Sequence, residues 1–276
     1  MRIENSTRST KAPVLLRLAL PAAALSLLLA LASAPRLLAQ SSDDVKTMDK
    51  VRALYLTGPI PSSISCDVAV DWDAFFKELK IEQTDEVKAR LQKFKAIQMH
   101  VVSRDATHTD VTITGADPSI STVADSLRQQ LGGFFQTYWS IGFAQFLGEK
   151  SDPFKLTPSA DGYEVTSGSE GSKVGVEIDK AFLVTQFSFV SPQMNAVMKP
   201  KFQAGSNGLL RLSSTDETVE MGASKMVVNF GWDYQKIDGY DIPQHLHMAL
   251  SGSYAFDYTL TGCKVTAEAS PVHPAK

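Results

Sequence analysis

The sequence predicts an α+β fold, in which one long apolar helix covers one face of an antiparallel sheet. Two patterns support this fold class. Residues 122–147 carry apolar side chains at helical spacing, and from Gly162 onward apolar and polar side chains mostly alternate with a period of two. Because only short turns separate the alternating segments, successive strands should be antiparallel neighbours. Each strand has one apolar face, so the sheet needs a cover on one side.

The first 39 residues have the pattern of a secretory signal peptide. A basic leader precedes an apolar run at 18–34, and the expected cleavage follows Ala39, since a cut after Ala34 would place Pro35 beside the scissile bond. The alternative is an uncleaved anchor, but the run is shorter than the roughly 20 residues that span a bilayer. We therefore expect a periplasmic or secreted protein without a transmembrane anchor after cleavage.

Charge and composition exclude some classes of partner. Residues 1–39 hold five basic residues and one acidic residue, so their removal changes the formal net charge from −3 to −7. With no run of Lys and Arg, nucleic acid is not an expected partner. No Pro- or Gly-rich linker divides the remainder, so we predict a single domain at 40–270 and a tail at 271–276, with the oligomeric state open.

The segment before the long helix mixes helices and strands. We predict a short helix at 45–56, a strand at 64–72 and helices at 74–79 and 85–97. Thr84 is the expected N-cap of the last of these, because Asp85 and Glu86 occupy its first turn. Residues 100–104 and 109–114 should form a hairpin.

The C-terminal half is predicted to consist of strands. They are expected at 163–165, 174–178, 183–189, 210–214, 225–235, 246–250 and 254–260, and Asp238-Gly239 is a strong turn signal.

The two cysteines, Cys66 and Cys263, could form a disulfide in an exported protein. The bridge would join the first strand of the domain to the last. However, Cys66 is in phase with the apolar face of its strand, whereas Cys263 is in phase with the polar face of its own. A pair of unbridged thiols, one buried and one half-exposed, therefore remains an alternative.

The aromatic half of the long helix is the candidate binding site. It could line an apolar cavity against the sheet, since aromatic side chains suit acyl chains. The candidate lining residues are Leu131, Phe134, Phe135, Tyr138, Trp139, Phe143, Phe230 and Trp232. The alternative is that these side chains only fill the core, which is the commoner role of an aromatic stripe.

Few residues suggest catalysis or a cofactor. The sequence has no glycine-rich phosphate loop, no Cys-x-x-Cys and no HExxH, and no cofactor is expected. His245 and His247 share one face of a strand and could hold a metal, but no third ligand is apparent. The carboxylates of Asp71 and Asp73 could act as an acid–base pair, although polar residues flanking a strand are the simpler interpretation.

Three short motifs resemble a known family. They are Gly-Tyr-x-Val at 162–165, Val-x-Ile-Asp-Lys at 176–180 and Ile-Asp-Gly-Tyr-Asp-Ile-Pro at 237–243. Together with the order of elements, the region from Gly162 to Val265 resembles the periplasmic lipoprotein-carrier superfamily (LolA/LolB-like). The resemblance implies a curved antiparallel sheet, a half-open β-barrel with helices packed on its concave face, that binds acyl chains or lipoproteins without catalysis.

Two main hypotheses follow for function. The first is an exported, non-catalytic carrier or sensor that binds a lipid or lipoprotein in an apolar cavity. The second is an envelope hydrolase or metal-binding protein that uses His245 and His247, and a third is a scaffolding protein of the cell envelope.

Overall fold

The computed structural model describes residues 42–55, 60–78, 84–142, 154–169, 171–205, 208–250 and 254–267. The predicted signal peptide, the tail and Phe143 lie outside these ranges. The helices are α1 (Ser42–Arg52), α2 (Trp72–Glu78), α3 (Asp85–Lys95) and α4 (Ser121–Thr137). A 3₁₀ turn (Pro118–Ile120) precedes α4, and a π-helical turn, η4 (Tyr138–Gly142), follows it.

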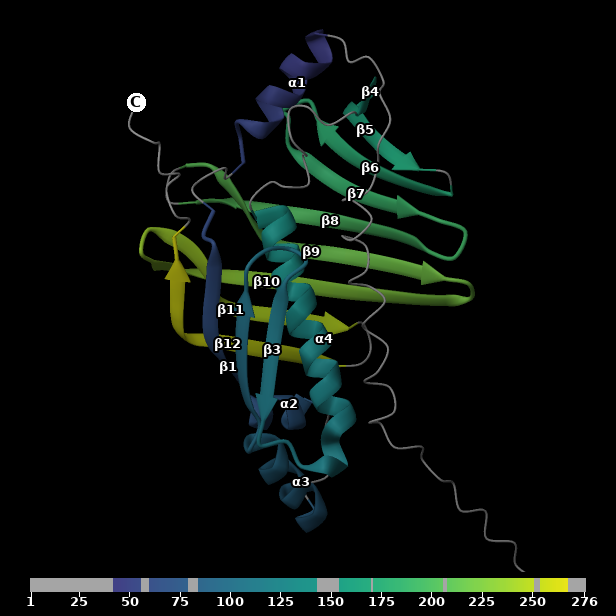
Figure 1. Cartoon of the computed structure of the whole chain (residues 1–276). Coiled ribbons are helices and arrows are strands. Elements are labelled where there is room, and N and C mark those ends of the chain that lie inside the picture. Colours follow the sequence, from purple (N-terminus) through teal and green to yellow (C-terminus); the bar gives the residue numbers. More distant parts are fainter. Residues whose placement is uncertain are drawn as a thin grey trace, which may run out of the picture.

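Twelve described strands belong to one sheet (Figure 1). They are β1 (Ser63–Val70), β2 (Gln98–Ser103), β3 (Thr109–Thr114), β4 (Lys155–Pro158), β5 (Gly162–Ser169), β6 (Ser172–Asp179), β7 (Val184–Val190), β8 (Asn195–Ala204), β9 (Leu210–Met221), β10 (Ser224–Ile237), β11 (Tyr240–Leu250) and β12 (Tyr254–Thr266).

The sheet is antiparallel throughout and open. Its order is β3-β2-β1-β12-β11-β10-β9-β8-β7-β6-β5-β4. The strands from β4 to β12 form a continuous meander, and the pairing of β1 with β12 adds the N-terminal strands to its end. The α+β fold class with an open antiparallel sheet is therefore as predicted.

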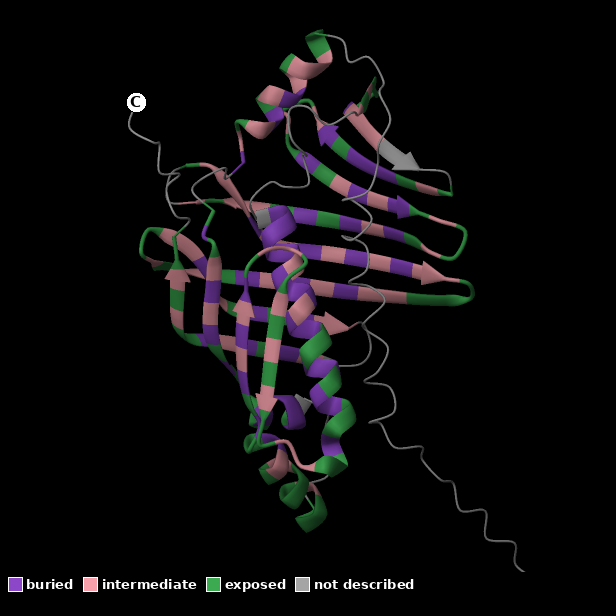
Figure 2. Cartoon of the chain, viewed as in Figure 1, coloured by how far each residue is buried: buried purple, intermediate pink, exposed green. Residues whose placement is uncertain are grey.

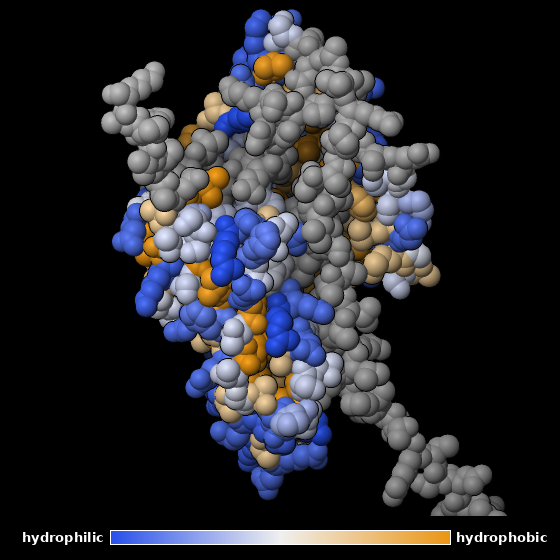
Figure 3. All heavy atoms as spheres, viewed as in Figure 1, coloured by the Kyte–Doolittle hydropathy of each residue, from blue (hydrophilic) through white to orange (hydrophobic). Residues whose placement is uncertain are grey.

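One face of the sheet is buried, as the alternating pattern requires. On β10, for example, Val228, Phe230 and Trp232 are buried, whereas the residues between them are more exposed. Figure 2 shows this alternation along the strands around α4. On the molecular face drawn in Figure 3, hydrophilic residues predominate and hydrophobic ones form narrow strips. The apolar side chains thus lie mainly inside the fold.

The helix α4 runs alongside the edge strand β3 and also contacts the buried face of the sheet (Figure 1). The Arg128 Nε donates to the Val111 carbonyl of β3 at 3.3 Å, and the Phe134 ring contacts Phe230 of β10 and Tyr258 of β12. An exposed strand edge is open to pairing with other chains. The helix therefore covers one edge of the sheet together with part of its apolar face.

Several elements differ from the sequence prediction, among them the unpredicted strand β4, and two of the differences have a local cause. Trp72 begins α2 instead of ending a strand, because the Asp71 carboxylate accepts a hydrogen bond from the Ala74 amide at 2.9 Å and caps the helix. The strand β8 was not predicted, since Pro200 and the flanking lysines obscure its alternation. The structure places Met198 and Pro200 on the buried face of β8. The Thr84 N-cap of α3 is confirmed by a hydrogen bond from the Val87 amide to its hydroxyl.

The structure joins Cys66 and Cys263 by a disulfide, with their Cα atoms 4.1 Å apart. The phase argument against this bridge was wrong because β12 contains a bulge. The pairing shifts register between Ser65 and Asp67, and Gly262, which lies opposite, has a φ of +58°. The extra residue turns Cys263 to the face that Cys66 occupies. A glycine directly before Cys263 was the available sequence signal.

We predict that removal of the disulfide destabilises the fold by about 5 kcal/mol, because the bridge closes a loop with a sequence separation of 197 residues. The measurement is urea denaturation of the Cys66→Ala/Cys263→Ala protein beside wild type. Wild type with reductant serves as the second comparison. An unchanged denaturation midpoint in both cases would show that the bridge does not restrict the unfolded chain.

Candidate functional site

The structure brings the predicted aromatic residues together beneath α4. Phe134 contacts Phe230 at 5.1 Å and Trp232 at 5.8 Å between ring centroids, and the Tyr138 ring lies against both Phe135 and Trp139. With Leu131, these side chains are all buried. Seven of the eight predicted lining residues thus form one closely packed cluster, and the eighth, Phe143, is outside the described residues. The aromatic half of the helix is packed core in this structure.

Polar contacts fix α4 to the sheet along its length. The Tyr258 hydroxyl of β12 donates to the Gln130 side-chain oxygen at 2.5 Å, and the Gln130 amide group donates to the Ser126 hydroxyl at 3.0 Å. Farther along, the Tyr138 hydroxyl donates to the Asp241 carbonyl of β11 at 3.0 Å. Because buried polar groups are costly when unpaired, these bonds hold the helix at one position on the sheet.

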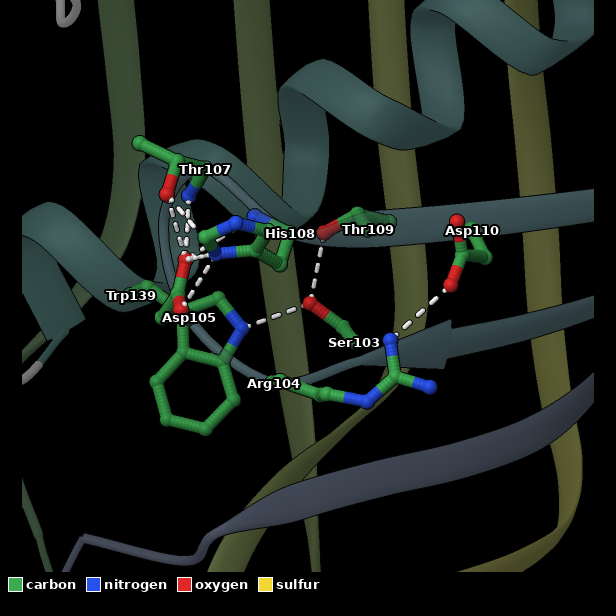
Figure 4. Close-up of polar contacts among 8 residues, drawn as sticks. All are labelled: Ser103, Arg104, Asp105, Thr107, His108, Thr109, Asp110 and Trp139. Carbon is green, nitrogen blue, oxygen red and sulfur yellow. Dashed lines mark hydrogen bonds and ion pairs between the residues drawn. The ribbon is translucent and has the colours of Figure 1, made fainter.

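A third contact joins the end of the helix to the β2–β3 hairpin (Figure 4). The Trp139 Nε1–H donates to the Ser103 hydroxyl at 2.7 Å, and Ser103 is also hydrogen-bonded to Thr109 at 2.6 Å. This pair of hydroxyl groups therefore positions the Trp139 indole in the core.

The adjoining turn holds His108 through a carboxylate. Asp105 accepts hydrogen bonds from the backbone amides of Thr107 and His108, and the His108 ring lies 2.7 Å from Asp105 Oδ2 (Figure 4). Burial alone would raise the pKa of Asp105, but the hydrogen bonds from these two residues lower the pKa to about 2. His100 is bonded to a different carboxylate, that of Asp67, so the two histidines of the hairpin have separate partners.

Unlike the polar groups described above, the Trp232 indole N–H forms no hydrogen bond within the described part of the chain. Its side chain is 3 % exposed, and its Nε1–H has no hydrogen-bond partner in the described part of the chain. Among the described residues, the aromatic rings of Phe134 and Phe230 contact this indole, and neither ring offers an acceptor atom. A buried donor without an acceptor costs about 1–3 kcal/mol, and such an atom is a place where a ligand could bind.

A row of side chains crosses eight strands on the same face of the sheet. Each residue is paired directly with the next, so their side chains point the same way. From β4 to β11 the row consists of Leu156, Val165, Val176, Phe187, Met198, Glu217, Val228 and Leu250. Seven of these residues are apolar, and one is a carboxylic acid.

Glu217 is buried in this row without a charged partner. Its side chain is 3 % exposed, its cross-strand neighbours are Met198 and Val228, and among the described residues no cation forms an ion pair with it. Its described hydrogen bond comes from the Thr215 hydroxyl at 3.5 Å. Desolvation raises the pKa of Glu217 to about 8, so its neutral form is favoured at pH 7.

Sequence analysis missed Glu217 because the strand was predicted to end at Ser214. The structure continues β9 to Met221, with Thr215, Glu217 and Val219 on the buried face. In residues 215–220 Val219 is the one apolar side chain, so the sequence shows no alternation that would extend the strand.

The other candidate residues lie apart from the cluster beneath α4. His245 and His247 are exposed, and each is hydrogen-bonded to β12, His245 to Thr259 and His247 to Asp257. No group of three His, Cys, Asp or Glu residues in the described ranges could hold a metal ion. Asp71 caps α2, whereas Asp73 forms an ion pair with Lys95 at 2.7 Å, so the two carboxylates have separate structural roles.

The comparisons with known proteins leave the family open. No protein-family model, curated protein or solved structure matches the chain significantly. None of the helices within the described residues has the length and apolar character needed to cross a membrane.

We predict that the free energy of unfolding falls as pH rises from about 5 to 8. The folded pKa of Glu217, about 8, lies above the ordinary value of 4.5, so unfolding releases a proton within this window and stability is lost as pH increases. The full pKa shift, from 4.5 to about 8, corresponds to a loss of about 5 kcal/mol in the free energy of unfolding. The measurement is urea denaturation of wild type and Glu217→Gln at several pH values between 5 and 9.

The matched control is Glu220→Gln on the same strand, since Glu220 is more exposed and paired with Lys225. This variant should retain the wild-type slope, whereas Glu217→Gln should lose most of it. Parallel pH curves for wild type and Glu217→Gln would contradict the assignment of the slope to Glu217.

Proposed function

We propose that this chain is an exported carrier or sensor that binds an acyl lipid or the acyl chains of a lipoprotein, without catalysis. In this proposal the sheet is a half-open barrel, α4 packs on its concave face, and the ligand occupies the part of that face beside the helix. The signal-peptide pattern supports a location in the periplasm or outside the cell.

The observation that carries the proposal is the width of the apolar face. The contacts of α4 and η4 described above run from β3 through β12, β11 and β10 to β9. Beyond β9 the same face continues over β8, β7 and β6, where Met198, Phe187 and Val176 are buried. Other parts of the chain already bury these side chains, so in this proposal an acyl chain, which has the apolar chemistry of this face, displaces part of that cover.

The polar groups on this face also fit a lipid site. Ligand sites for apolar molecules are lined mainly by apolar and aromatic side chains, with a few polar groups that fix orientation. Glu217 and the Trp232 Nε1–H are two such groups, both buried on the apolar face. The disulfide is compatible with export to an oxidising compartment, and the family resemblance favours the same function.

Tryptophan fluorescence provides a direct test, because the protein has three tryptophans. Trp139 and Trp232 lie at α4, whereas Trp72 packs against Phe75 and Phe94 beside α2 and α3. We expect an acyl chain brominated near its middle to quench the Trp72→Phe protein, in which Trp139 and Trp232 remain. Bromine quenches tryptophan only at close range, so quenching reports a bound chain.

The Trp139→Phe/Trp232→Phe protein, which retains Trp72, is the matched control and should be quenched much less. Circular dichroism would verify that both proteins are folded. Equal quenching of the two would indicate non-specific association, and no quenching of either would rule out an acyl chain beside α4.

A further inference from the structure

Three polar side chains of β1 and β2 form a hydrogen-bonded chain on the face of the sheet opposite α4. The Ser65 Oγ lies 3.0 Å from His100 Nε2, and His100 Nδ1 lies 2.8 Å from Asp67 Oδ1. The strand register explains this arrangement, because Asp67 is paired directly with His100 and Ser65 lies two residues away on the same face. Val68, which follows Asp67, is buried on the other face, which α4 covers.

The chemistry of the three groups fixes the direction of each hydrogen bond. A carboxylate only accepts hydrogen bonds, so the His100 Nδ1 carries the ring proton and donates it to Asp67. In the neutral imidazole Nε2 is then the acceptor, and the Ser65 hydroxyl donates to it. This is the order of a hydroxyl nucleophile, a general base and a carboxylate that orients the base.

The other described histidines lack this arrangement. The hydrogen bonds of His108, His245 and His247 to described residues all involve Nδ1. Within the described part of the chain, His100 is therefore the histidine that connects a hydroxyl on one ring nitrogen to a carboxylate on the other. The pair of His247 with Asp257 has the same His–carboxylate contact without a nucleophile, so it provides a matched control.

The surroundings of Ser65 suit attack on an ester. The His100 side chain is 44 % exposed and Ser65 is half-buried, so a substrate reaches both from solvent. Ser65 is paired directly with Lys264 of β12 on one side and with Val102 of β2 on the other. The Lys264 side chain brings a positive charge to this face, where an ester carbonyl attacked by Ser65 develops negative charge. Val102 offers apolar surface for a small acyl group.

We propose that Ser65, His100 and Asp67 form a catalytic triad that hydrolyses small esters on this open face. Ser65 Oγ bonds to the ester carbonyl carbon while its proton passes to His100 Nε2. The C–O bond to the alcohol then breaks, and the alcohol leaves with that proton. Water, activated by the same nitrogen, releases the acid and restores the Ser65 hydroxyl. Asp67 is a positioning residue, since it acts through the imidazole.

This activity goes beyond the binding function proposed above, because it uses the opposite face of the sheet and none of the residues beside α4. The brominated acyl chain tests that binding function separately, so either proposal can fail without the other.

The test measures hydrolysis of p-nitrophenyl acetate and covalent labelling by a fluorophosphonate. Attack of Ser65 on the phosphonate forms an O–P bond and releases fluoride, so peptide mapping should locate the label on Ser65. We expect Ser65→Ala and His100→Gln to lower kcat by about a hundredfold. Asp67→Asn should lower kcat by about tenfold with little change in KM, because water can partly replace an exposed carboxylate.

The control variant His247→Gln should keep the wild-type kcat and labelling, and circular dichroism would verify that each variant is folded. If wild type neither turns over the ester nor takes the label at Ser65, the triad is inactive and these contacts only join β1 to β2. A folded Ser65→Ala protein with the wild-type kcat would equally overturn the proposal, since hydrolysis would then come from another group.

Discussion

The pairing of β1 with β12 is the contact on which the rest of the structure depends. It joins β1, the first described strand along the chain, to β12, the last, and the Cys66–Cys263 disulfide links the same two strands. Because β2 and β3 follow β1 in the sheet order, this pairing also sets the position of β3. The chain leaves β3 and enters α4, so the helix reaches Tyr258 and Phe230 only when the N-terminal strands are in place. The position of α4 on the apolar face thus depends on the pairing of two strands that are far apart in the sequence.

The contacts of α4 limit the ways in which the protein could bind a ligand. Gln130, Tyr138 and Trp139 each form a hydrogen bond to a different part of the sheet, and the aromatic side chains between them are closely packed. Displacing the helix would break all of these bonds together and expose the aromatic cluster to water. Binding beside α4, on the face that extends over β8, β7 and β6, preserves them. The geometry therefore favours a helix that stays fixed on the sheet over a helix that leaves it.

Alternation of apolar side chains was sufficient to predict the fold class and most strands, because burial of one face imposes a period of two. The errors arose where a local feature changes that period or hides it. A bulge at Gly262 reversed the expected side of Cys263, and Pro200 concealed β8. In the site, the aromatic residues of α4 were identified because they are apolar, whereas Glu217 was missed because the strand was predicted to end at Ser214. Its burial depends on the strands that lie on either side, and these cannot be inferred from β9 alone.

Glu217 shows how one buried polar group can oppose the stability of the sheet. A leucine in its place would continue the apolar row from Met198 to Val228 and would avoid the cost of desolvating a carboxyl group. The hydroxyl of Thr215 offsets only part of that cost, because its single hydrogen bond is long at 3.5 Å. Ion pairing offers no compensation within the described residues. Glu217 is therefore a net cost to the stability of the sheet.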